Sequence, residues 1–231
     1  SVSAIIERAN KNAGKLEGDF TIIHGDIAVY TGLQNADPCT SSKCRWPRSS
    51  DKKVYVPYVI SRQYSPRERN VIQNALDSFQ KSTCIRFKPH RNEVDYIDII
   101  SKKGCYSRVG RVGGQQNLSL QHPGCVEHGV IQHELLHALG FEHEQSRSDR
   151  DKHVKILFDN IKPDEKDNFE KVNTNNLNTP YDYNSIMQYD RCASSKNGQP
   201  TMIPIPDNNV PIGLATEMSP NDILRVNRLY C

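Results

Sequence analysis

The sequence lacks several features by which common classes of protein are recognised. It contains no run of about eighteen apolar residues, so no segment is predicted to span a membrane. Residues 1–8 lack the apolar core of a secretory signal peptide, so if the protein is exported we expect its signal peptide to have been removed already. Neither sign of charge dominates, because the net charge is only +3, and this gives no special attraction to nucleic acid or to an anionic membrane.

Two further patterns are missing, one of cysteines and one of repeats. None of the seven cysteines forms a Cys-x-x-Cys pair, which argues against a zinc ribbon and against a thioredoxin-like redox site. The chain also has no internal repeat. What is present is a chain of 231 residues, 36% hydrophobic and 25% charged, which is enough for one large domain or two modest ones in a folded protein.

A histidine-rich segment, residues 133–144, carries the chemistry. His133 and His137 are four residues apart, which on an α-helix places them about 40° apart around the axis and one turn above each other. Two imidazoles in this arrangement can bind one metal ion. Glu134 lies beside them and can reach a water molecule on that metal.

A third ligand follows the predicted end of this helix. His143 is six residues beyond His137, so on a continuing helix it would point away from the first two histidines. Gly140 can end the helix, since glycine adopts the left-handed conformation without a Cβ penalty, and the turn then brings His143 back. Three neutral imidazole nitrogens with an open fourth position are typical of catalytic zinc, whereas structural zinc sites are closed.

A second segment supports this interpretation. The longer histidine pattern is the metzincin signature, which is followed further along the chain by a turn containing methionine. Residues 185–189, Ser-Ile-Met-Gln-Tyr, supply that turn. With Glu144 directly after the third histidine and Tyr189 two residues past Met187, the chain from about residue 35 to residue 231 resembles the astacin family of zinc endopeptidases.

The resemblance implies a fold and a division of the chain. The fold is α+β, in the two-subdomain arrangement of metzincins, with the zinc cleft between the subdomains. The N-terminal subdomain, residues 35–143, would hold a twisted, mostly parallel sheet with helices, and the C-terminal subdomain, residues 144–231, would be irregular. Together they form the catalytic domain, 35–231, and residues 1–34 would be an inhibitory pro-segment.

Local patterns agree with this division. Ser65 and Ser219 are each followed by proline and, three residues on, by an acidic residue, which predicts the starts of two helices. The zinc helix is predicted at residues 127–140 and a short helix at residues 5–12. Strands are predicted at residues 54–60, 84–87, 96–100 and 117–120, a loop or hairpin at 104–114, and loops at 173–183 and 197–211. The resemblance makes strand 117–120 the sheet edge along which an extended protein or peptide substrate binds.

The resemblance also assigns roles to the site residues. The three histidines would bind one zinc ion per chain, and Glu134 would act as general base toward the zinc-activated water that hydrolyses the peptide bond. Tyr189 would stabilise the oxyanion of the tetrahedral intermediate. Met187 would form an apolar floor beneath the zinc.

The first 34 residues contain two Gly-Asp pairs, which end at Asp19 and Asp26. Both can be explained as turns, since glycine and aspartate are common turn residues. They also resemble the zinc-blocking aspartate of astacin precursors, whose carboxylate takes the place of the water and so removes the nucleophile. Asp26 fits that motif better than Asp19, because Ile27 follows it and because it lies nearer the start of the catalytic domain.

Activation is expected to depend on a cleavage near the bond between Gln34 and Asn35. In this family the freed N-terminal ammonium is buried against the glutamate that follows the third histidine, here Glu144, and a buried ion pair needs both partners. No lysine or arginine lies between Asp26 and Cys39, so the activating protease has no trypsin-like site there.

The cysteines predict disulfides, because the histidines already account for the metal site, and disulfides indicate a secreted protein. Spacing alone leaves their connectivity open. The resemblance implies the pairs Cys84–Cys231 and Cys105–Cys125. The short loop from Cys39 to Cys44 can close on itself, as in the six-cysteine astacins of fish such as hatching enzymes and nephrosin. The seventh cysteine, Cys192, is left either as a free thiol or as a link to another chain.

Alternatives of other classes stay open. The chain could be a catalytically silent binding scaffold on a metzincin fold, or a structural protein whose histidines only hold the fold, although Glu134 and all three histidines are intact. Among peptidases, an exopeptidase is the alternative to an endopeptidase. For the endopeptidase we expect a monomer, outside the cell or in a secretory granule, with protein substrates and without a nucleic-acid partner.

Overall fold

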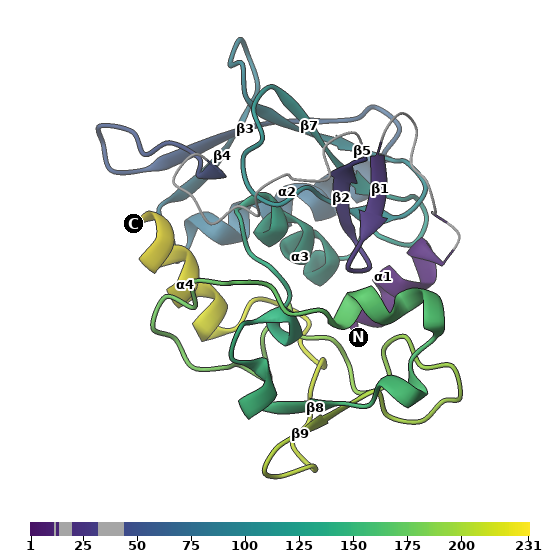
Figure 1. The fold of residues 1–231 in the computed structure, drawn as a ribbon. Helices are drawn as coiled ribbons and strands as arrows, with labels where there is room; N and C mark the ends of the chain where they lie inside the picture. Colours follow the sequence, from purple (N-terminus) through teal and green to yellow (C-terminus); the bar gives the residue numbers. More distant parts are fainter. Residues whose placement is uncertain (12, 14–19, 32–43) are drawn as a thin grey trace.

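The computed structural model describes residues 1–11, 13, 20–31 and 44–231, and a five-stranded sheet lies in its upper part in Figure 1. The strand order is β4-β3-β5-β7-β6. The strands are β3 Val54–Ile60, β4 Ile85–Pro89, β5 Tyr96–Ile100, β6 Cys105–Tyr106 and β7 Gln115–Leu120. The first four strands of this order pair in parallel and β6 is antiparallel to β7, so the predicted, mostly parallel sheet is confirmed.

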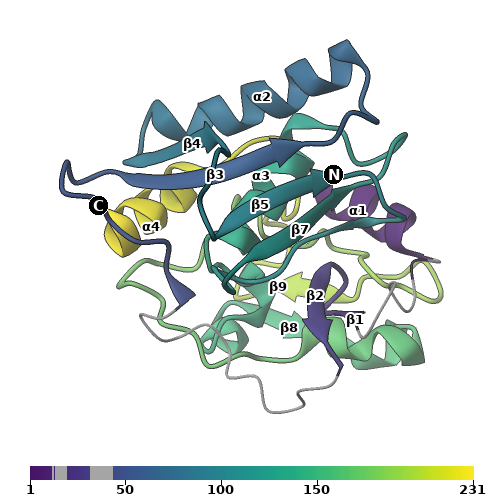
Figure 2. The ribbon, with the colours of Figure 1, turned by 90° about the horizontal axis from the view of Figure 1, so that it is seen from above.

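Helices α2 (Pro66–Gln80) and α3 (His128–Ala138) share one hydrophobic core with this sheet. In Figure 2 the strands lie in front of α3, with their other face open. α2 begins at its predicted cap, where the Ser65 hydroxyl accepts a hydrogen bond from the Glu68 N–H and the Glu68 carboxylate accepts one from the Ser65 N–H. The cap therefore fixes where α2 begins.

The C-terminal half, residues 144–231, has little regular structure. It holds a two-stranded sheet, β8 (Val154–Ile156) and β9 (Met202–Pro204), with a small core of its own. Four short 3₁₀ turns are η2 Glu144–Ser146, η3 Arg150–Lys152, η4 Phe158–Asn160 and η5 Pro163–Phe169. The last helix, α4 (Pro220–Tyr230), starts at the predicted Ser219 cap and returns to the N-terminal half, where the Tyr230 hydroxyl donates to the Leu139 carbonyl at 2.7 Å.

The N-terminal segment forms a helix and a hairpin that contact the rest of the described chain. These are α1 (Val2–Asn10) and the antiparallel strands β1 (Phe20–Ile23) and β2 (Ile27–Tyr30), drawn in purple in Figure 1. Val2 and Ile6 are buried in the same core as the sheet, α2 and α3. Among the described residues, no helix is both long enough and apolar enough to cross a membrane.

Three expectations about local structure were wrong. β7 lies between β5 and β6, so strand 117–120 is not a sheet edge, and the two edges are β4 and β6. β6 lies inside the segment 104–114 and is antiparallel to β7, which agrees with the hairpin alternative for that segment. β9 lies inside the predicted loop 197–211, and α1 begins at Val2, with Ser1 as its cap, rather than at residue 5. Strands of two or three residues are too short to show an alternating pattern, so periodicity does not detect them.

Candidate metal centre

The helix α3 places two histidines deep inside the molecule. Every residue from Gly129 to Ala138 is buried, because α3 packs against the sheet, α1 and α2 rather than exposing a polar face. Gly140 follows with a φ of +103°, and its N–H donates to the His137 carbonyl at 2.8 Å. This left-handed residue ends the helix and sends the chain back toward the site. His143, which comes after it, is also fully buried.

The three histidines converge on one carboxylate. The Asp26 oxygens lie 2.9 Å from His133 Nε2, 3.3 Å from His137 Nε2 and 3.0 Å from His143 Nε2. The Nε2 atoms of His137 and His143 are 3.3 Å apart. With zinc–nitrogen distances of about 2.0–2.1 Å, the ligand atoms of a tetrahedral site are separated by about 3.3 Å, so these spacings fit four-coordinate zinc.

The hydrogen bonds around the ligands also fit a cation. His133 Nδ1 donates to the Ile186 carbonyl at 2.9 Å, and His137 Nδ1 donates to the Phe141 carbonyl at 2.7 Å. These bonds leave both Nε2 lone pairs facing the centre, as metal-binding histidines require. Asp26 Oδ1 is buried and has no hydrogen-bond donor among the described residues, so a positive ion is the partner that this carboxylate lacks.

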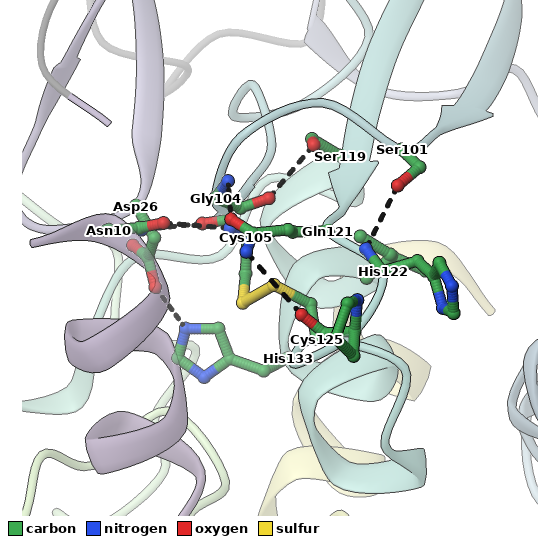
Figure 3. The surroundings of a disulfide bond; sticks show 12 residues. Asn10, Asp26, Ser101, Gly104, Cys105, Ser119, Gln121, His122, Cys125 and His133 are labelled. Carbon is green, nitrogen blue, oxygen red and sulfur yellow. Dashed lines mark hydrogen bonds and ion pairs between the residues drawn. A yellow bond between two sulfur atoms is a disulfide. The ribbon is translucent and has the colours of Figure 1, made fainter. Parts of the chain in front are cut away.

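Asp26 reaches this position from the turn of the β1–β2 hairpin. His24 and Gly25 have positive φ values of 50° and 90°, and a Cβ on Gly25 would overlap the Tyr189 hydroxyl. Figure 3 shows the Asp26 carboxylate directed at the His133 ring. Burial acts to raise the pKa of Asp26, but the three imidazoles hold that pKa well below its usual value. Asp26 is thus both a turn residue and a metal ligand.

Two further predicted residues, Glu134 and Tyr189, lie at the same centre. Glu134 is fully buried, and neither carboxylate oxygen has a hydrogen-bond partner among the described residues. Burial, followed by the charge of Asp26, raises the pKa of this carboxyl well above its ordinary value. The Tyr189 ring lies 4.7 Å from the His143 ring, and its hydroxyl donates to the His24 carbonyl at 2.7 Å. The N-terminal segment therefore holds the Tyr189 hydroxyl.

The predicted methionine turn is anchored by the C-terminal helix. Asp222 accepts hydrogen bonds from the Ser185 hydroxyl at 2.6 Å and from the Ile186 N–H at 2.9 Å. The same carboxylate caps α4 by accepting from the Ser219 N–H at 2.9 Å. Met187 is buried in the main core. One aspartate thus fixes the turn whose Ile186 carbonyl orients His133.

The buried Glu144 carboxylate forms ion pairs with two arginines that the sequence pattern did not indicate. Its two oxygens accept from Arg225 at 2.6 and 2.9 Å, and Arg147 Nη1 lies 3.4 Å away. The Asp182 N–H also donates to it at 2.7 Å. Glu144 therefore already has ionic partners in this form, and its expected pairing with a freed N-terminal ammonium, which concerns the cleaved form, stays a prediction. A cavity of about 390 Å³, lined in part by Glu144 and Arg225, lies beside it.

The disulfides tie the site to the scaffold. Cys84 is bonded to Cys231 and Cys105 to Cys125, the two pairs that the resemblance implied. Cys192 is exposed and forms no disulfide with the described cysteines. Cys39 lies outside the described residues, and so do Asp19 and the Gln34–Asn35 bond, so the pairing of Cys39 with Cys44 remains a prediction.

Several residues of the centre were not found by sequence reasoning. Most of them act through main-chain carbonyls or across long stretches of chain, and these are Asn10, Phe141, Ile186, Asp222 and Arg225. Arg147 is a local partner, three residues after Glu144. The cap pattern at Ser219 identified Asp222 as an N3 residue, which was the one available signal. No spacing rule indicates that the same carboxylate holds a turn 36 residues earlier.

Comparison with known proteins places this centre in a family. The model of the peptidase family Astacin matches residues 40–231. High choriolytic enzyme 1 of Oryzias latipes is 52% identical over 213 residues, which cover 92% of this chain and 78% of that protein. Low choriolytic enzyme of the same fish is 48% identical over 231 residues, which cover 99% of this chain and 83% of that protein.

Solved structures agree with this family assignment. The structure of high choriolytic enzyme 1, a hatching enzyme zinc-protease from medaka, superposes with a TM-score of 0.81 at 54% identity, covering 85% of this chain and 98% of that one. Myroilysin superposes with a TM-score of 0.56 at 17% identity, covering 82% of this chain and 96% of that one, which supports the fold alone.

Proposed function

Because this chain belongs to the astacin family and is a zinc metalloendopeptidase, we propose that it is a latent precursor with residues 1–34 as its inhibitory pro-segment. Residues 35–231 then form the catalytic domain, with subdomains 35–143 and 144–231. One observation carries the proposal. The Asp26 carboxylate lies within 3.3 Å of all three imidazole nitrogens, in the position that a water molecule needs for attack.

The residues of the centre divide the work of peptide hydrolysis. His133, His137 and His143 hold the zinc, which when bound polarises the scissile carbonyl and lowers the pKa of a water molecule. Glu134 takes the proton from the attacking water and gives it to the leaving amine. Tyr189 donates its hydroxyl to the oxyanion once the pro-segment has left it.

The substrate is a protein that binds in extended form along β6, the antiparallel edge strand of the sheet, once the N-terminal segment has left it. β-augmentation uses main-chain hydrogen bonds and so tolerates many sequences, which suits an endopeptidase. The relatives that are named choriolytic enzymes favour a protein of the egg envelope as the substrate of this chain. The disulfides and these relatives favour secretion, and we expect the protein to act outside the cell, or to be stored in a granule, as a monomer.

Activation requires cleavage near the Gln34–Asn35 bond. This removes Asp26 from the metal and frees a new N-terminal ammonium, for which the 390 Å³ cavity beside Glu144 provides space. Because Arg225 already neutralises Glu144, the ammonium would join an existing ion pair rather than complete one. The contact of Glu144 with Arg147, at 3.4 Å, is the longest of its ionic contacts and the one that we expect to change.

The direct test compares the full chain with a chain cleaved between Gln34 and Asn35. Zinc content is measured by mass spectrometry, and activity is measured on internally quenched peptides with blocked ends and on free dipeptides. We expect one zinc per chain in both forms, activity in the cleaved form alone, and cleavage of blocked peptides alone. A cleaved form that binds zinc and hydrolyses nothing would identify a binding scaffold, and cleavage of free dipeptides alone would identify an exopeptidase.

A further inference from the structure

Asn10, the last residue of α1, makes contacts that the metal chemistry does not explain. Its Nδ2 donates to the Cys105 carbonyl at 2.7 Å and to the Gly25 carbonyl at 2.7 Å. Its Oδ1 accepts from the Cys105 N–H at 2.8 Å. Figure 3 shows this carboxamide between the Asp26 turn and Cys105. The Asn10 carboxamide therefore both donates to and accepts from the main chain of one edge-strand residue, Cys105.

These contacts fall on the free side of the sheet edge. In an antiparallel pair, successive residues turn their main-chain groups alternately toward the partner strand and away from it. The Gly104 carbonyl accepts from the Gln121 N–H, next to β7, whereas the N–H and carbonyl of Cys105 face Asn10. An extended chain added to this edge would bond to those same two groups of Cys105.

The next outward-facing residue, Ser107, is covered by the pro-segment in a different way. The Ser107 N–H donates to the Asp26 carbonyl at 3.0 Å, and the Ala28 N–H donates to the Ser107 carbonyl at 2.8 Å. Main chain of the pro-segment thus pairs with Ser107. It cannot pair with Cys105 as well, because the chain turns at Gly25 to direct Asp26 at the metal. The carboxamide of Asn10 has the same polar groups as a peptide unit. It forms the two hydrogen bonds to the Cys105 N–H and carbonyl that a neighbouring strand would otherwise form.

The fit at Asn10 is close. Gly104 has a φ of +102°, and a Cβ there would overlap Asn10 Oδ1. The bond to the Gly25 carbonyl also joins α1 directly to the turn that carries Asp26. Two carbonyls face Nδ2, so an aspartate of the same shape would lose both donated bonds and would place its charge against them.

We propose that Asn10 is a positioning residue that closes the substrate-binding edge by standing in for a peptide unit at Cys105. The inference rests on the proposed function, because it assumes that β6 receives the substrate. Latency then has two separate parts. Asp26 blocks the metal, and Asn10 blocks the main-chain groups that the substrate needs and holds the Asp26 turn in place.

The test uses the full-length chain with Asp26→Ala, in which the metal is open but the pro-segment still covers the edge. There the pro-segment competes with substrate, so it raises the apparent KM, and saturating substrate displaces it without a change in kcat. Adding Asn10→Ala removes three hydrogen bonds and should lower the apparent KM roughly tenfold at constant kcat. Asn10→Asp, which keeps the shape, should act in the same direction. The matched control is Glu7→Gln, which loosens the same helix at Lys162 without contact to Cys105.

A second readout does not depend on activity. In the chain with Asp26 intact, Asn10→Ala should speed hydrogen exchange of the Cys105 amide roughly tenfold, measured by NMR, while the α1 amides keep their protection. Equal KM effects of Asn10→Ala and Glu7→Gln, or unchanged exchange at Cys105 in both Asn10 variants, would overturn the role of Asn10. Inactivity of every variant even after pro-segment removal would instead refute the proposed function, and the exchange experiment would still decide the role of Asn10.

Discussion

The zinc ligands come from two regions that are built differently. The three histidines belong to a buried helix and its following turn, and carbonyls of Ile186 and Phe141 fix the rings of His133 and His137. Asp26 comes from a two-stranded hairpin whose turn contains residues with positive φ, and it is held by contacts to the sheet edge, Asn10 and Tyr189. Under the proposed function, the histidine region is the permanent region, which stays with the catalytic domain, and the aspartate region is the detachable region, which cleavage removes. In an enzyme built this way, the zinc ligands can be fully assembled while the Asp26 carboxylate prevents activity.

This difference implies a rule for variants. A change in the permanent region should affect the full chain and the cleaved chain alike. A change in the detachable region should affect the full chain and leave the cleaved chain unaltered.

The largest effect is expected at Glu134. Glu134→Gln removes the general base while keeping shape, so the cleaved form should lose about 10³-fold in kcat. Zinc content by mass spectrometry should stay at one per chain, since Glu134 is not a ligand. His133→Ala is the contrasting variant and should lose the zinc itself. Activity of Glu134→Gln within tenfold of the unaltered cleaved enzyme would refute the assigned role.

Arg225 should come next, through stability. Arg225→Met leaves the buried Glu144 carboxylate without its main partner, which should cost about 3–5 kcal/mol of unfolding free energy in both the full and the cleaved chain. Urea denaturation measures it. Arg228→Met, on the same helix, should cost about 1 kcal/mol, because Arg228 donates only to the Leu177 and Asn178 carbonyls among the described residues. Similar losses of unfolding free energy in the two variants would mean that the ion pair of Arg225 with Glu144 contributes no more to stability than the bonds of Arg228.

Gly25 tests the detachable region. Gly25→Ala would strain a residue with a φ of +90° and crowd the Tyr189 hydroxyl, at a cost of about 1–2 kcal/mol to the turn. Residual activity of the full chain should rise about tenfold, and the cleaved chain should be unchanged. Gly124→Ala is the control, because that glycine has a φ of +131° but no neighbouring atom within 4 Å of an added Cβ. Residual activity of full-length Gly25→Ala no higher than that of full-length Gly124→Ala would show that this turn does not hold Asp26 at the metal.

The smallest effect is expected at Glu7. Its ion pair with Lys162, at 2.8 Å, is partly exposed, so Glu7→Gln should change stability by less than about 1 kcal/mol. The residual activity of the full chain should rise less than about threefold. A fluorogenic assay of the uncleaved variant at low and high salt measures it. A rise as large as that of Gly25→Ala would mean that the pro-segment is held mainly by α1 and not by its turn.

The permanent region could largely be predicted from the sequence, because its rules are local. Helical spacing brings His133 and His137 together, the left-handed Gly140 ends their helix, and the serine caps mark where α2 and α4 begin. Asp26 was also identified, but through family resemblance and the isoleucine that follows it.

The remainder depends on long-range contacts. The sheet edge is a strand of two residues, β6, which has no periodicity, so the longer strand β7 was mistaken for it. Glu144 meets Arg225 across 81 residues, and Asn10 meets Cys105 across 95. No local propensity encodes such pairs, because they form only when the tertiary fold brings the two segments together.

We expect Asp26 alone to block the metal, and one comparison tests this most directly. Asp26→Ala and Asp19→Ala are introduced separately into the full-length chain, each is loaded with one zinc, and hydrolysis of a blocked fluorogenic peptide is measured without prior cleavage. We predict activity for Asp26→Ala, and none for Asp19→Ala or for the unaltered chain. Activity of Asp19→Ala with silence of Asp26→Ala would contradict the account.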